Sequence, residues 1–257
     1  MATAESLCQL AGIAWHEEGG AGILAETLAE TVATGLQLGI DSNGAASLVV
    51  SGGSTPAPVF KHLSAADIDW QNVSVTLADE RWVPADHPDS NERLVRSTLL
   101  VDKASVASFV PLYLAALDVE AAETAVATAV GAMRQPFTVV ILGMGEDGHT
   151  ASLFPDAPAQ QLHRAMQVEQ PAIVCAMHPP SVDQARMTLS RSALLNADRR
   201  YLHITGESKQ QVLLDALLQS RSGNDDNDVP GSYNPGMKPV IGLLTHQPER
   251  ATVFWSP

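Results

Sequence analysis

The stretch VVILGMGEDGHTASLFP, residues 139–155, places groups capable of proton transfer directly after an apolar run. One of these groups is His149, and histidine is the commonest side chain in general acid–base catalysis because an imidazole ordinarily titrates near neutrality. Asp147 lies two residues earlier and can orient the imidazole or stabilise its charged form. The pair predicts an acid–base centre in this loop. The alternative is that both residues serve only as turn and helix-cap groups.

Three glycines of the same loop have the G-x-G-x-x-G spacing of a dinucleotide-binding turn: Gly143, Gly145 and Gly148. Such a turn normally belongs to the first strand–helix unit of its fold, whereas at least two such units precede this one. The two acids at positions 146 and 147 would also oppose a bound pyrophosphate. Asp147 and His149 have no further ligands at metal-binding spacing. We therefore predict no cofactor and no metal.

A second glycine turn, SGGSTP, covers residues 51–56 and separates an apolar strand from a predicted helix. Gly52 and Gly53 let backbone N–H groups point outward, while Ser54 and Thr55 add hydroxyl donors. A junction of this kind binds anions, because free N–H groups and the helix dipole both favour negative charge. The turn therefore predicts a phosphate site; an ordinary capped turn is the alternative.

Four further charged residues lie at or near the ends of predicted strands. Asp79 and Arg81 belong to LADERWVP, where an apolar wall beside the charges favours a functional site over a surface ion pair. Arg186 lies in ARMTLS. Lys209, in ITGESK, falls in the first turn of a predicted helix, where a cation opposes the helix dipole by about 0.3–1 kcal/mol. A cation placed against the helix dipole at such a junction indicates a bound anion; a solvated lysine is the alternative.

Strands and helices alternate along the chain, and these elements must position the site. The expected strands are 46–50, 73–78, 137–142, 171–179, 185–190, 199–205 and 251–255, with 185–190 a candidate for antiparallel pairing. Helices are expected at 21–39, after Pro56, after Asp89 or Ser90 as the cap, at 118–134 and at 206–220.

Apolar strands without alternation, separated by helices, predict an α/β fold with an open, mostly parallel sheet and helices on both faces. We expect one domain over residues 1–257, with a mobile loop at 221–232. Ligands bind such sheets at the carboxyl ends of the strands, so loops 51–55, 79–84 and 143–149 should converge.

The bulk composition limits the possible partners and compartments. A net charge of −14 argues against nucleic-acid and membrane partners. Cys8 and Cys175 are expected to be unpaired thiols. No apolar run is long enough to span a membrane, and the absence of Lys and Arg before Lys61 argues against a leader peptide. We expect a cytoplasmic monomer or weak dimer.

Taken in order, SGGSTP, DERWVP…DSN, GMGEDGHTASLFP, RMTLS and ITGESK resemble the motifs of the 6-phosphogluconolactonase family over residues 20–220. The resemblance implies the α/β sheet also used by glucosamine-6-phosphate deaminases. It implies hydrolysis of 6-phospho-D-glucono-1,5-lactone to 6-phosphogluconate in the oxidative pentose phosphate pathway, with a phosphosugar lactone as the small-molecule partner. The C-terminal SYNPGMKPVIGLL departs from the family pattern.

The resemblance also implies residue roles. Gly53, Ser54 and Thr55, with Arg186 and Lys209, would hold the phosphate. His149 would deprotonate the attacking water, and Asp147 would orient it. Arg81 would stabilise the oxyanion, together with backbone N–H groups of the glycine loop, and Asp79 would position sugar hydroxyls or Arg81.

Two other functions remain open on the sequence alone. Glucosamine-6-phosphate deaminases share SGGSTP and the D-G-H core, but they carry a glutamate five residues after the histidine. Phe154 occupies that position here, and Arg81 also favours the lactonase. A non-enzymatic sugar-phosphate effector domain is the second alternative; no basic helix pair for DNA binding accompanies it.

Overall fold

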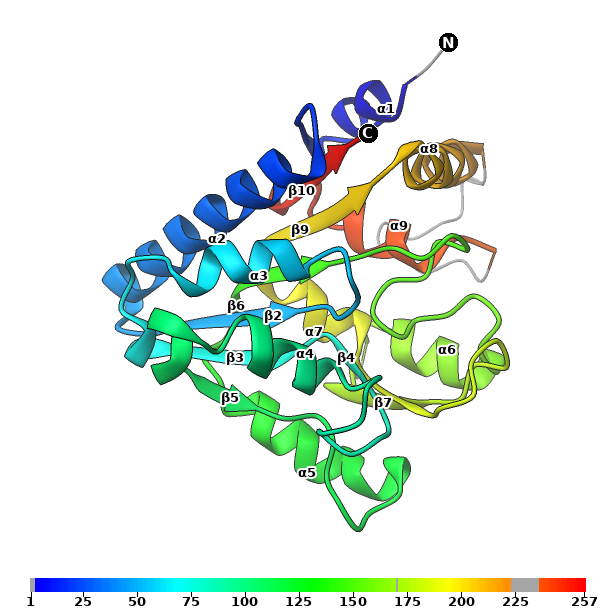
Figure 1. Cartoon of the computed structure of the whole chain (residues 1–257). Coiled ribbons are helices and arrows are strands. Elements are labelled where there is room, and N and C mark those ends of the chain that lie inside the picture. The colour runs from blue at the N-terminus through cyan, green and yellow to red at the C-terminus, as the bar shows by residue number, and fades with distance from the viewer. Residues whose placement is uncertain (1–2, 170, 223–235) are drawn as a thin grey trace.

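Parallel strands form the main sheet of the computed structural model, which describes residues 3–169, 171–222 and 236–257. Their order across the sheet is β1 (Ala14–Glu17), β10 (Ala251–Ser256), β9 (Ala197–Thr205), β6 (Phe137–Leu142), β2 (Ala46–Val50), β3 (Val73–Leu77) and β5 (Ser108–Val110). Every neighbouring pair in this sheet is parallel. Figure 1 shows the sheet from β10 at the upper end to β5 at the lower end. The predicted fold class is confirmed.

A second, antiparallel sheet of three strands lies beside the first. Its order is β4 (Asp79–Arg81), β8 (Arg186–Leu189) and β7 (Val174–Met177). The antiparallel pairing anticipated for 185–190 is therefore observed, with Arg81 opposite Arg186. The small sheet brings the DER segment next to the RMTL segment, which lies more than 100 residues away along the chain.

Helices cover both faces of the main sheet. Within the described residues they are α1 (Ala4–Leu10), α2 (Ala21–Asn43), α3 (Ala57–Ser64), α4 (Asn91–Thr98), α5 (Val119–Gly131), α6 (Ala159–Met166), α7 (Arg191–Leu195), α8 (Glu207–Ser222) and α9 (Pro239–Leu244). Short 3-10 helices are η1 (Trp70–Asn72), η2 (Asp102–Val106) and η3 (Pro248–Arg250).

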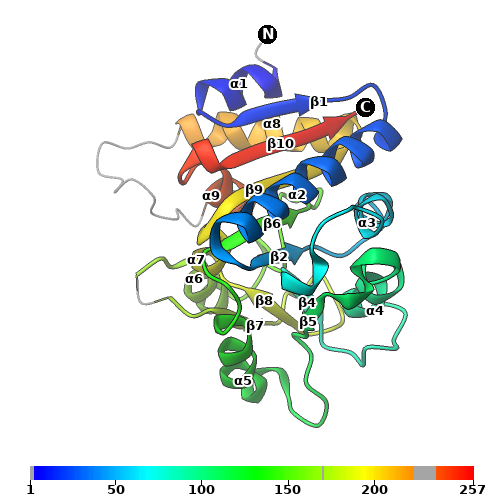
Figure 2. The ribbon, with the colours of Figure 1, turned by 90° about the vertical axis from the view of Figure 1, so that its left-hand side faces the viewer.

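Two successive residues of β9 identify the faces, because neighbouring side chains of a strand point to opposite sides. Arg199 lies against Gly35 of α2, whereas Arg200 donates to the carbonyl of Leu195 at the end of α7. Helices α2 and α7 therefore lie on opposite faces. Figure 2 shows α2 running along the sheet in front of β9.

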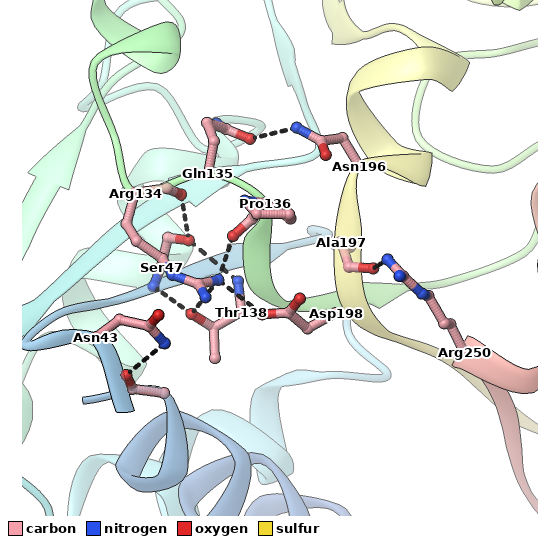
Figure 3. Close-up of polar contacts among 11 residues, drawn as sticks. Asn43, Ser47, Arg134, Gln135, Pro136, Thr138, Asn196, Ala197, Asp198 and Arg250 are labelled. Atoms are coloured by element: carbon pink, nitrogen blue, oxygen red, sulfur yellow. Dashed lines mark hydrogen bonds and ion pairs between the residues drawn. The ribbon is translucent and has the colours of Figure 1, made fainter. Parts of the chain in front are cut away.

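Polar contacts fix the amino end of the sheet, opposite the predicted site (Figure 3). The backbone N–H of Ser47 donates to Oγ1 of Thr138 at 3.0 Å, and the N–H of Thr138 donates to Oγ of Ser47 at 3.1 Å. Arg134 forms an ion pair with Asp198 at 2.7 Å. These contacts join the beginnings of β2, β6 and β9, and so hold the register of the strands that carry the site at their other ends.

Several sequence expectations are refined by the structure. Ser90, not Asp89, caps α4, since its hydroxyl accepts from the N–H of Arg93. Arg221 and Ser222 belong to α8, so the loop predicted at 221–232 is wrong for its first two residues, and the rest of it lies outside the described residues. Both cysteines are buried and unpaired, as expected. No described helix has the length and apolarity to cross a membrane.

Candidate active site

The three predicted loops meet at a cavity of about 300 Å³ at the carboxyl ends of β2, β6 and β9. Its lining includes most of the predicted site residues: Gly52, Gly53, Ser54, Thr55, Asp79, Arg81, His149 and Lys209. Asp147 and Arg186 are not among the lining residues, but both lie directly behind residues that are. The predicted residues that line the cavity thus come from four separate segments of the chain.

His149 and Asp147, which the sequence predicts to be an acid–base pair, are hydrogen-bonded to each other. The Nδ1 atom of His149 lies 2.6 Å from Oδ1 of Asp147, and the same oxygen accepts the backbone N–H of His149 at 3.0 Å. With Nδ1 engaged by the carboxylate, Nδ1 carries the proton in the neutral ring and Nε2 is the basic nitrogen. The ring is part-exposed, with 29% of its side chain accessible. The geometry suits a general base.

The ring of Phe154 packs against one face of the His149 imidazole. The two rings are stacked, with centroids 4.1 Å apart and an interplanar angle of 24°. Phe154 is buried in the hydrophobic core, so it offers a fixed surface to the imidazole. The position that separates lactonase from deaminase in sequence therefore contacts the catalytic candidate directly, a contact that spacing alone does not reveal.

Backbone turns hold the glycine loop against His149. The N–H of Gly145 donates to the carbonyl of His149 at 2.9 Å, and the N–H of Gly148 donates to the carbonyl of Gly145 at 3.0 Å. A Cβ at Gly145 would overlap the imidazole. Gly148 has a φ of +82°, a conformation that side-chain-bearing residues rarely adopt. These glycines serve the tight turn that presents His149.

The SGGSTP turn depends on a residue that the sequence reasoning missed. A Cβ at Gly52 would overlap the side-chain amide of Asn91, which is itself buried and lines the cavity. The amide nitrogen of Asn91 donates to the backbone carbonyl of Asp79 at 2.8 Å. Gly53 has a φ of +99°, and Ser54 and Thr55 after it are exposed at the cavity. Asn91 therefore ties the SGGSTP turn to strand β4.

Glu80 anchors this arrangement from within. Its fully buried carboxylate accepts the N–H groups of Asn91 and Glu92, at 2.7 and 2.8 Å, and the hydroxyl of Ser90 at 3.0 Å. Burial raises the pKa of Glu80, while these hydrogen bonds act in the opposite direction. A carboxylate at the amino end of α4 also complements the helix dipole. Glu80 thus fixes the flanking residues Asp79 and Arg81.

Asp79 and Arg81 project from β4 into the cavity region. Oδ2 of Asp79 accepts the hydroxyl of Ser152 at 2.6 Å, and Asp79 is almost fully buried. Arg81 is half-buried and one of its Nη1 protons goes to the carbonyl of Asp89. The remaining guanidinium donors leave Arg81 able to contact a bound ligand.

Lys209 lies in the first turn of α8, as predicted, where it is paired with a carboxylate of the chain. Its Nζ lies 3.2 Å from Oε1 of Glu146, and Oε2 of Glu146 accepts the hydroxyl of Ser208 at 2.7 Å. The hydrogen bonds from Ser208 and Lys209 lower the pKa of Glu146. Glu146, whose charge would oppose a bound pyrophosphate, therefore neutralises Lys209.

Arg186 lies on β8, opposite Arg81 of β4, and is not among the residues that line the cavity. It is almost fully buried, and within residues 3–169, 171–222 and 236–257 its Nε and Nη1 have no hydrogen-bond partner. Burial lowers the pKa of Arg186, and the positive charge of Arg81 lowers it further, whereas Asp79 raises it. A buried guanidinium with free donors adds positive potential beneath the site.

His203 of β9 also lines the cavity and carries no signal in the sequence that sets it apart. It is 3% exposed, and neither ring nitrogen has a hydrogen-bond partner in the described part of the chain. Burial lowers the pKa of His203 to about 4. The imidazole is therefore neutral at physiological pH.

The arrangement of the carboxylate, imidazole and thiol groups bears on whether the site could hold a metal ion. Among the described residues, no group of three or more His, Cys, Asp or Glu side chains is arranged to hold a metal ion. The carboxylates of Asp79, Asp147 and Glu146 each accept hydrogen bonds from protein donors. These three carboxylates are thus engaged by groups of the chain itself.

The sequence of the chain is similar to those of known proteins over most of its length. Residues 21–237 match the family described as glucosamine-6-phosphate isomerases/6-phosphogluconolactonase. A 6-phosphogluconolactonase of Rhizobium meliloti (strain 1021) is 39% identical over 234 residues, covering 91% of this chain and 94% of the relative. One of Pseudomonas putida is 37% identical over 247 residues, covering 96% and 94%.

Solved structures agree. A 6-phosphogluconolactonase from Shewanella baltica OS155 has a TM-score of 0.84 and 40% identity, covering 95% of this chain and 98% of its own. A monomeric glucosamine-6-phosphate deaminase at 18% identity has a TM-score of 0.71, covering 95% and 97%, and shares the fold. The chain therefore belongs to the glucosamine-6-phosphate isomerase/6-phosphogluconolactonase family.

Proposed function

We propose that the chain hydrolyses 6-phospho-D-glucono-1,5-lactone to 6-phospho-D-gluconate, the lactone-opening step of the oxidative pentose phosphate pathway. The observation that carries the proposal is the His149–Asp147 pair, joined at 2.6 Å, beside a cavity that the SGGSTP turn also lines. Relatives named 6-phosphogluconolactonase, which the chain matches over nearly their whole length, support this choice of substrate.

The phosphate is assigned to the SGGSTP turn and its neighbours. Outward N–H groups at Gly52 and Gly53 and the hydroxyls of Ser54 and Thr55 donate to its oxygens. Lys209 supplies a charge from the amino end of α8, once it exchanges Glu146 for the ligand. The buried cation of Arg186 raises the positive potential beneath them, against a chain whose net charge is −14.

The lactone carbonyl is then placed toward His149. Nε2 of His149 removes a proton from water as the water oxygen bonds to the carbonyl carbon. Asp147 keeps the ring oriented and stabilises the imidazolium that forms. Arg81, with N–H groups of the glycine loop, stabilises the developing oxyanion, and Asp79 positions either Arg81 or the sugar hydroxyls. The ring C–O bond breaks, and the proton held on His149 passes to the departing oxygen.

The deaminase and effector alternatives predict different behaviour. A deaminase releases ammonia from glucosamine 6-phosphate, and the carboxylate expected for that work is replaced by Phe154, which stacks on His149. An effector domain binds the sugar phosphate without opening the lactone. Neither ammonia release nor binding without hydrolysis is expected here.

The test is lactone hydrolysis, corrected for spontaneous ring opening. His149→Ala should lower kcat by about 10²–10⁴-fold, the usual contribution of a general base. His62→Ala, an exposed histidine of α3, is the matched control and should hydrolyse at the native rate. Thermal unfolding of both variants should resemble that of the native chain. A native rate in His149→Ala would overturn the assignment of the base.

A further inference from the structure

The segment that begins at residue 236 contacts the catalytic loop, and the family model matches the chain only as far as residue 237. Lys238 caps α9, and α9 lies next to α8 (Figure 1). The cavity lining ascribed to the site does not include Lys238. Its contact is with the outer side of the loop that carries His149.

Side-chain carbons of Lys238 lie directly over Gly148. A Cβ built at position 148 would be 2.5 Å from Cδ of Lys238, 2.8 Å from its Cβ and 2.9 Å from its Cγ. The aliphatic stem therefore covers the Cα of Gly148, where any larger residue would clash. The N–H of Val240 also donates to the carbonyl of Gly148 at 3.2 Å. Side chain and backbone of one short segment thus hold the same glycine.

Gly148 is a sensitive point of the loop. It immediately precedes His149, it has a positive φ of +82°, and its N–H closes the turn onto Gly145. A change in the conformation of Gly148 therefore moves the imidazole relative to the cavity. Displacement of a catalytic group by about 1 Å can lower a rate 10²-fold.

The support behind Lys238 is rigid. The α9 residues Val240, Ile241, Leu243 and Leu244 are buried in the hydrophobic core. Nε of Arg191 donates to the carbonyl of Gly242 at 2.9 Å, and Nε2 of Gln219 donates to the carbonyl of Gly236 at 3.0 Å. The segment on both sides of Lys238 is thus hydrogen-bonded to α7 and α8. The stem of Lys238 therefore packs against the loop from a segment that is itself held in place.

We propose that Lys238 is a positioning residue for the catalytic loop: its aliphatic stem, rather than its charge, holds Gly148 so that His149 faces the cavity. The kinetic part of this inference rests on the proposed lactone hydrolysis. The structural part concerns the loop itself and is measured without any turnover.

The kinetic experiment compares Lys238→Ala, which removes the stem, with Lys238→Met, which keeps an aliphatic stem and removes the charge. Lys238→Ala should lower kcat about tenfold or more, with KM and the inhibition constant of inorganic phosphate within about twofold of native. Lys238→Met should restore kcat to within about twofold. Lys103→Ala, an exposed lysine paired with Asp67, is the matched control. Equal losses in the alanine and methionine variants would assign the effect to charge and overturn the proposal.

Amide hydrogen exchange of residues 143–149 tests the same idea independently of catalysis. Lys238→Ala should accelerate exchange in this loop about tenfold, while Lys238→Met and Lys103→Ala exchange at the native rate. Unchanged exchange in Lys238→Ala would overturn the proposal even if the lactone is hydrolysed. Conversely, a native chain that leaves the lactone at its spontaneous rate would refute the proposed function, and the exchange measurement would still decide the role of Lys238.

Discussion

The imidazole of His149 lies stacked on the ring of Phe154, with centroids 4.1 Å apart. At the edge of the same imidazole, Nδ1 lies 2.6 Å from Oδ1 of Asp147. The stack on Phe154 fixes the plane of the ring, and the hydrogen bond to Asp147 fixes the orientation of the ring within that plane. Together they leave Nε2 as the nitrogen available for proton transfer. A base oriented in this way reaches a reactive geometry without further rearrangement.

Removing the aromatic face of residue 154 should therefore slow the reaction without unfolding the chain. Phe154→Leu keeps an apolar side chain in the core but abolishes the stack. Aromatic pairs contribute about 0.5–1.5 kcal/mol beyond their buried area, so kcat should fall about two- to tenfold with KM unchanged. Steady-state hydrolysis of the lactone measures this, with Phe109→Leu on β5 as the control. A rise in KM alone would contradict the orienting role.

How far the sequence predicts this site depends on whether the signal is local. The strands Ala46–Val50 and Phe137–Leu142 have the bounds expected, because mainly apolar runs that are buried on both faces carry their own signal. The short strands β1 and β5 are part-exposed and form through pairing with β10 and β3, so a local pattern does not reveal them.

The same distinction holds for individual site residues. His149, Asp147 and Lys209 lie in motifs whose strand-end position is readable from the chain. Asn91 and Lys238, in contrast, act through contacts with glycines that are about 40 and 90 residues away in sequence. Only the folded arrangement of α4 and α9 brings them there, and no spacing rule in the sequence records it.

Neutralising Asp147 should affect kcat more than stability. Asp147→Asn preserves the size of the side chain but weakens the bond to Nδ1 and the support for the imidazolium. We expect kcat to fall on the order of 10²-fold, with KM within a few-fold of native. Asp67→Asn, on an almost fully exposed aspartate, serves as the control. Native turnover in Asp147→Asn would remove the carboxylate from the mechanism.

The ion pair between Glu146 and Lys209 should weaken the binding of phosphate. Glu146 holds Lys209 at 3.2 Å, so a bound anion must compete with this carboxylate. An exposed pair contributes about 0–1 kcal/mol, and Glu146→Gln should therefore lower the inhibition constant of inorganic phosphate by up to about fivefold. Glu26→Gln makes the same change in net charge on the exposed side of α2. Equal effects of both substitutions would assign the gain to overall charge.

Burial of His203 should make the chain less stable in mild acid. Its pKa is about 4 in the folded chain, against 6.5 for an exposed histidine. As the pH falls from 6.5 toward 4, the unfolded chain takes up a proton that the folded chain does not, so the free energy of unfolding decreases across this window. At full burial this shift corresponds to about 2–3 kcal/mol by pH 4.5.

Urea unfolding at pH 7 and pH 4.5 isolates this contribution. The native chain should lose about 2–3 kcal/mol more between the two pH values than His203→Leu, which has no group to titrate there. Other acid-sensitive groups, including the buried Glu80, are common to both proteins and cancel in the difference. Because neither ring nitrogen of His203 has a partner in the described structure, no native hydrogen bond is lost in the variant. Parallel pH dependences in the two proteins would show that His203 is protonated as readily in the folded chain as in the unfolded one.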